Sequence, residues 1–128
     1  MRVFIVFVLL LSGLSLLAFG IAIARDPLGI MAMADVFATG AAAAVELRAF
    51  YGGLEIALAV VILICALRPE RRRDGLWLTL FIYAGIGVTR LIGMGIDEVS
   101  SSFLRVALSV ELGIAALAAL ALYLQRRV

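Results

Sequence analysis

Three charged residues interrupt long apolar runs of this sequence: Glu55, Arg90 and Glu111. A charged side chain inside a membrane-spanning helix costs about 2.5–3.5 kcal/mol on insertion scales, so each of them needs a structural or chemical reason. At ~1.5 Å per helical residue, Glu55 lies ~20 Å from the expected inner end of its run, and Arg90 and Glu111 lie at similar depths (~24 and ~22 Å) in theirs. We therefore predict one layer that holds two carboxylates and one guanidinium.

This layer has two interpretations. In the first, opposite charges pair and fix how the helices pack, because bare charges cannot face lipid. In the second, the layer surrounds a cleft open to the outer leaflet, where Arg90 binds a polar or anionic head group and Glu55 or Glu111 carries a proton as the catalytic candidate. A second arginine and two tyrosines share helix faces with these charges and serve either as donors or as packing residues. The predicted ligand-binding or structural polar network is Arg48, Tyr51, Glu55, Tyr83, Arg90 and Glu111.

The residue types that are missing exclude several kinds of site. The sequence has no His and no Lys, and Cys65 is its only cysteine, so zinc, haem and iron–sulfur sites lack ligands. Glu55 and Glu111 alone supply too few oxygens for a hard metal ion. No phosphate-loop or dinucleotide motif occurs, so we expect no metal and no cofactor. Cys65 lies in an apolar run and is interpreted as a packing residue.

The composition identifies the elements that must position the charged layer. Of the 128 residues, 66% are hydrophobic and 16% charged, with a mean hydropathy of +1.21, whereas soluble domains are about half apolar and about a quarter charged. The segment 27–44 is too interrupted to span, and we predict that it is partly helical and lies at the interface or caps the bundle. The predicted fold is all-α, a transmembrane antiparallel four-helix bundle in one membrane domain over 1–128, with spans at about 3–24, 45–67, 75–95 and 103–124.

The arginines predict the orientation of this bundle. They gather at the two termini and in the loop 68–74, whereas acidic residues gather at the other end, so we expect both termini on the cytoplasmic side of the inner membrane. Trp77 and Tyr123 fall near that boundary, as interfacial anchors do. A signal peptide is the alternative for the first run, but its apolar stretch is long for one, and we expect a retained span. Arginines that flank spans do not indicate nucleic acid binding.

Two patterns stay open as hypotheses. The second and fourth spans share an Arg followed by a Glu, at Arg48 and Glu55 and at Arg105 and Glu111, which is compatible with an internal duplication. The loop 68–74 is short, so it makes the second and third spans antiparallel neighbours. Its arginines are explained most simply as a signal that sets the membrane topology, and the alternative is that they bind acidic lipid or a partner protein.

The chain resembles an uncharacterised bacterial family of small four-span integral membrane proteins that contain a domain of unknown function. The resemblance rests on a Glu-x-Arg-x-x-Tyr-Gly-Gly motif at 46–53, on Arg90 with Gly93 and Asp97, and on Glu111. Thr89 stands where the family pattern favours Gly. The resemblance implies the four-helix architecture and brings no activity.

Three classes of function follow from this reading. The first is binding of a lipophilic small molecule with a polar head at the charged layer, in the outer half of the membrane. The second is an accessory or structural subunit, in which glycine-rich and alanine-rich faces dock a membrane-protein partner or a second copy. The third is a small acid–base enzyme, of the isomerase or cyclase type, that acts on a lipid-like substrate. In all three classes, membrane lipid surrounds the protein and is an expected partner.

Overall fold

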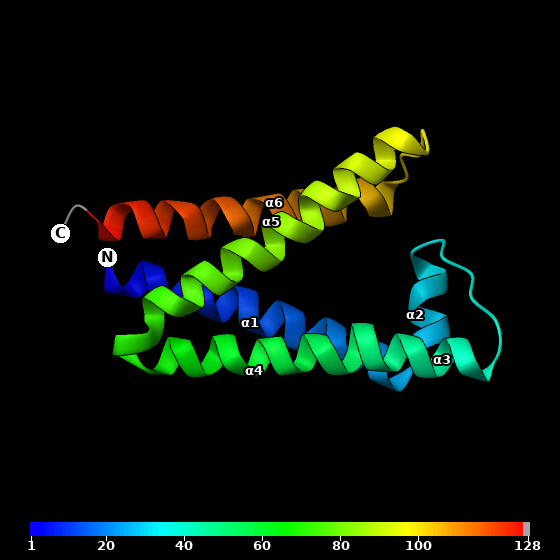
Figure 1. Cartoon of the computed structure of the whole chain (residues 1–128), viewed down its shortest axis with the longest axis horizontal. Helices are drawn as coiled ribbons and strands as arrows, with labels where there is room; N and C mark the ends of the chain where they lie inside the picture. Colours follow the sequence, from blue (N-terminus) through cyan, green and yellow to red (C-terminus); the bar gives the residue numbers. More distant parts are fainter. Residues whose placement is uncertain (127–128) are drawn as a thin grey trace.

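The computed structural model describes residues 1–126 of the chain, all of whose regular elements are helices (Figure 1). The predicted all-α fold is confirmed. The predicted C-terminal flank lies within the described residues only as far as Arg126, and Arg127 lies outside them. In chain order the elements are α1 (Arg2–Arg25), α2 (Pro27–Met33), α3 (Ala41–Leu47), the π-helix η1 (Arg48–Gly53), α4 (Leu54–Leu67), the short 3₁₀ helix η2 (Pro69–Arg71), α5 (Arg72–Ile96) and α6 (Ser102–Gln125).

Four continuous helical stretches are long and apolar enough to cross a membrane. The second stretch combines α3, η1 and α4 and runs from Ala41 to Leu67, so it contains the predicted span 45–67 and the four residues before it. The segment 27–44 is partly helical: it contains α2, which stands across the long axis of α4, and the first residues of this second stretch (Figure 1). The four stretches are Arg2–Arg25, Ala41–Leu67, Pro69–Ile96 and Ser102–Gln125.

The spans pack as two close pairs, α1 with α4 and α5 with α6. Glycines make the close approach possible: a Cβ on Gly20 would lie 2.9 Å from Ile56 Cγ1 and 3.0 Å from the Gly52 carbonyl oxygen, and one on Gly87 would lie 2.8 Å from Leu112 Cδ2. α4 and α5 are neighbours near the short connection at η2 and diverge toward their other ends (Figure 1). The two pairs therefore separate at one end of the bundle.

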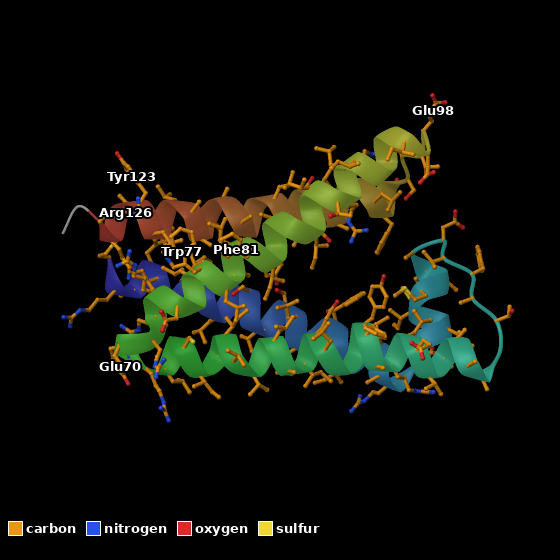
Figure 2. All side chains as sticks on the ribbon, in the orientation of Figure 1. Glu70, Trp77, Phe81, Glu98, Tyr123 and Arg126 are labelled. Atoms are coloured by element: carbon orange, nitrogen blue, oxygen red, sulfur yellow. The ribbon has the colours of Figure 1, made fainter. Side chains whose placement is uncertain are left out.

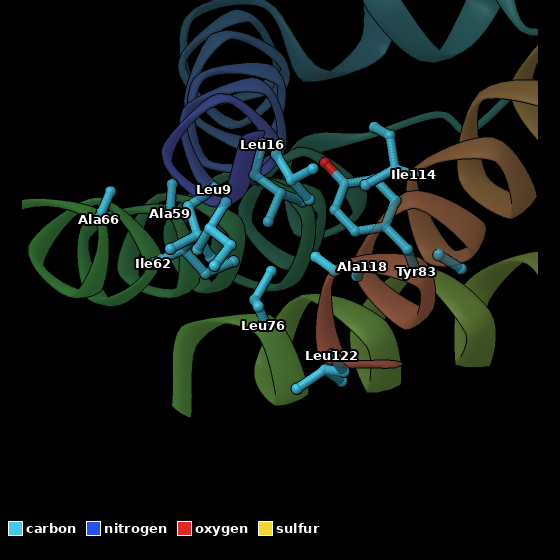
Figure 3. Close-up of a cluster of buried hydrophobic side chains, with 14 residues drawn as sticks. Leu9, Leu16, Ala59, Ile62, Ala66, Leu76, Tyr83, Ile114, Ala118 and Leu122 are labelled. Carbon is cyan, nitrogen blue, oxygen red and sulfur yellow. The ribbon is translucent and has the colours of Figure 1, made fainter. Parts of the chain in front are cut away.

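The core joins the two pairs near the end that holds this connection. Its fully buried side chains include Leu9 of α1, Ile62 of α4 and Leu76 of α5. Small residues of α6, Ala118 and Ala121, are fully buried in the same cluster, so α6 comes close to its neighbours (Figure 3). Each leucine or isoleucine buried in this way would cost about 2–5 kcal/mol on truncation to alanine, which fixes this end of the bundle.

Polar side chains set where two of the helices begin. Asp26 ends α1 and caps α2, since its Oδ1 accepts a hydrogen bond of 3.0 Å from the Gly29 amide, and Pro27 occupies the first turn of α2. Ser101 caps α6 through a 3.1 Å bond from the Leu104 amide to its Oγ. The orientation of these helices relative to the cytoplasm stays a prediction from the arginines.

Candidate functional site

Arg90 of α5 and Glu111 of α6 form a bidentate ion pair. Arg90 Nε donates to Glu111 Oε2 at 2.8 Å, and Arg90 Nη2 donates to Oε1 at 2.6 Å. The two side chains are 26% and 12% exposed. The glycine one turn before the arginine, Gly87, brings α5 against α6 at this level. Two parallel charge-assisted hydrogen bonds neutralise both groups and are compatible with an apolar surrounding.

Arg48 lies apart from this pair. It is exposed, and its Nε donates to the carbonyl oxygen of Ala24 at 3.1 Å. That carbonyl belongs to the last turn of α1, whose acceptors have no partners within the helix, so Arg48 acts as a cap. The π-helix η1 starts at Arg48 and places Gly52 against Ala24, where an added Cβ would lie 3.2 Å from the alanine Cβ. The structure thus connects Arg48 to the end of α1 and not to the charged layer.

Tyr83 is buried between α5 and α1. Its hydroxyl donates to the Ser12 carbonyl oxygen at 3.0 Å and lies 2.6 Å from Ser15 Oγ. One turn away, Ser12 Oγ and Thr79 Oγ1 are 3.1 Å apart and hydrogen bonded. This seam of hydroxyls satisfies the polar groups of two spans. The sequence analysis missed both serines, although they are the only hydroxyl-bearing side chains of the first apolar run and their spacing of three residues places them on one helix face.

Glu55 lines a cavity of about 600 Å³ that lies between the two helix pairs and is open to the molecular surface. The carboxylate is half-buried, and no hydrogen bond or ion pair connects it to any residue in 1–126. The only other polar side chain in the lining is that of Tyr51, which is 46% exposed. The remaining lining is apolar and comes from α1, η1, α4 and α5: Leu16, Phe50, Leu54, Leu58, Ile82, Gly85 and Ile86.

By their contacts, the six residues predicted as one network form four groups, and Glu55 still lies within electrostatic range of Glu111 and Tyr83. Arg90 and Glu111 pair with each other, Arg48 caps α1, Tyr83 joins a hydroxyl seam, and Glu55 shares an apolar cavity with Tyr51. Within residues 1–126 no cluster of three or more His, Cys, Asp or Glu side chains could hold a metal ion.

Cys65 lies outside these groups. It is a buried residue of α4 with a free thiol. A Cβ added to Gly75 would lie 2.6 Å from the Cβ of Cys65, so Cys65 packs directly against this glycine. Its position is that of a small apolar side chain at a close helix contact.

Comparison with known proteins places the chain in a family without giving it an activity. No curated protein matches the sequence, and no solved structure matches it either. A protein family described as a domain of unknown function, DUF4345, matches residues 4–122, a stretch that contains all four membrane helices except their outermost residues. Because the match extends over nearly the whole chain, this membrane protein belongs to the DUF4345 family.

Proposed function

We propose that this protein binds a lipophilic small molecule with a polar head, and that the head group is held by Glu55 in the cavity between the helix pairs. One observation carries the proposal: a carboxylate lies in an apolar cavity of about 600 Å³ without a hydrogen-bonding partner among residues 1–126. A charged or polar group in such a place is costly unless something pairs with it, and a bound molecule would supply the pairing.

The walls of the cavity suit the apolar part of a ligand. Ligand sites are clefts of roughly 300–1,000 Å³ that are mostly apolar and contain a few polar groups that fix orientation. Here Leu16 and Leu58 supply aliphatic surface, and Phe50 supplies an aromatic ring. Gly85 adds no side chain, and an added Cβ there would meet no atom within 4 Å. This absence leaves room beside Glu55.

The charges around the cavity indicate the chemistry of the head group. The sequence analysis gave Arg90 the role of holding an anionic head; in the structure its Nε and Nη2 donate to Glu111, and Arg90 is not among the residues that line the cavity. The polar groups left for a ligand are the Glu55 carboxylate, which accepts hydrogen bonds, and the Tyr51 hydroxyl. A head group that donates hydrogen bonds, such as an ammonium, hydroxyl or amide, therefore fits better than an anionic one.

The test is native mass spectrometry of the full chain, extracted gently from the membranes in which it is expressed. The informative variant is Gly85→Leu, which fills the cavity from a position with open space for a Cβ. Its matched control is Gly93→Leu, on the same helix and with equally open space, but outside the lining. We expect a discrete small-molecule adduct in the wild type and in the control, and its loss in Gly85→Leu.

A second variant, Glu55→Gln, tests the head group while keeping the shape of the side chain. Hydrogen bonds to a charged partner contribute about 1.5–3 kcal/mol, so an adduct held by the carboxylate should be retained roughly tenfold less or weaker still. An adduct retained equally in all variants would place the ligand elsewhere and refute the proposal. A bare chain in the wild type would do the same, and added protein mass without a small molecule would favour the accessory-subunit class.

A further inference from the structure

A second cavity lies at the opposite end of the molecule from the diverging helices. It measures about 360 Å³ and is formed where α1 begins, α5 begins and α6 ends. Figure 1 shows these three ends together, and Figure 2 shows Arg126 at this end and Glu98 at the other. The lining residues are Met1, Arg2, Ile5, Arg73, Gln125 and Arg126.

The described lining of this cavity is basic. Arg2 of α1, Arg73 of α5 and Arg126, which directly follows α6, line it, and no carboxylate of residues 1–126 does. The ion pairs within residues 1–126 join Arg71 to Asp74 and Arg90 to Glu111, so none of these three arginines takes part in one. Guanidinium groups bind phosphate oxygens through paired hydrogen bonds, and three of them around one space favour a phosphate group as the occupant.

The position of the cavity distinguishes a lipid from a soluble phosphate. It lies at the ends of helices that are long and apolar enough to cross a membrane, where lipid phosphates are found. We infer that Arg2, Arg73 and Arg126 form a specific site for the head group of an anionic phospholipid, with phosphatidylglycerol as the probe.

This inference is independent of the Glu55 cavity and is tested separately. The full chain is reconstituted in nanodiscs that contain equal amounts of phosphatidylglycerol and phosphatidylcholine, and native mass spectrometry after gentle release measures which lipids stay bound. The test variant is Arg73→Gln with Arg126→Gln. The matched control is Arg68→Gln with Arg71→Gln, which removes the same charge from the same end and leaves the cavity lining unchanged.

We expect the wild type and the control to retain phosphatidylglycerol over phosphatidylcholine, and the cavity variant to lose this preference by about tenfold or more. Equal loss in the two variants would indicate general attraction to a basic surface and would overturn the inference. Equal retention in all three proteins would also overturn it. So would binding of inorganic phosphate by the detergent-purified wild type without any preference for phosphatidylglycerol, because the source would then be a soluble phosphate.

Melting temperatures of the variants in the same nanodiscs separate a lost site from a lost fold. If the double variant loses its helical circular dichroism signal, Arg73→Gln alone takes its place, with Arg68→Gln as its control. We then expect the preference for phosphatidylglycerol to fall more in Arg73→Gln than in Arg68→Gln, and equal preferences in the two would overturn the inference.

Discussion

The bidentate pair between Arg90 and Glu111 predicts an unusual pattern of stabilities. Removing one partner leaves the other charged and unpaired between helices, which costs about 3–5 kcal/mol for buried pairs. The two side chains are 26% and 12% exposed, so we place each single change, Arg90→Met or Glu111→Leu, near the lower end, at about 3 kcal/mol. Replacing both groups by apolar side chains removes the unpaired charge together with its partner and is often close to neutral.

The double variant, Arg90→Met with Glu111→Leu, should therefore be more stable than Arg90→Met alone, by at least about 2 kcal/mol. The assay is unfolding of the purified protein in mixed micelles with a rising fraction of sodium dodecyl sulfate, followed by far-ultraviolet circular dichroism. Arg105→Met is the control, since the guanidinium of this exposed arginine of α6 donates to Ser100 and Ser102 near the start of its own helix and takes part in no ion pair within residues 1–126. We expect it to change stability by less than about 0.5 kcal/mol.

Two outcomes would refute this reasoning. If the double variant is destabilised by the sum of the two single changes, the side chains act independently and the pair does not hold α5 against α6. If the single changes cost no more than Arg105→Met, the pair is exposed to water and contributes little, as surface ion pairs do. The first outcome would also mean that Arg90 is available to bind a ligand.

Further predictions concern the contacts between the helix pairs and use the same unfolding assay. Gly20→Ala should destabilise the protein by about 1–3 kcal/mol because its Cβ would press on the backbone of Gly52. The control Gly113→Ala, whose Cβ would enter open space, should be neutral or stabilising. Equal effects of the two changes would contradict the close packing of α1 on α4. Tyr83→Phe should cost about 1 kcal/mol, since it removes two hydrogen bonds between spans that average ~0.6 kcal/mol each. Thr79→Val should cost about half as much, and a larger loss than in Tyr83→Phe would show that the seam is not organised around the tyrosine.

Local patterns in the sequence determined the helical architecture. Apolar runs of span length, ended by arginines, by Asp26 with Pro27 and by the polar turn before Ser102, define four helices, because a membrane-spanning chain must satisfy its backbone within each helix. The second helical stretch begins at Ala41, four residues before the predicted span, because alanine favours helix strongly.

Only the tertiary structure decided which polar groups meet. Depth along a helix follows from residue counting, and it placed Arg90 and Glu111 at one level, where they do bond. Rotation and separation of the helices do not follow from counting, because they depend on distant contacts such as those of Gly20 and Gly87. For the same reason the sequence did not indicate that Glu55 would be left without a partner: the divergence of α4 from α5, not the sequence of either helix, opens the cavity around it.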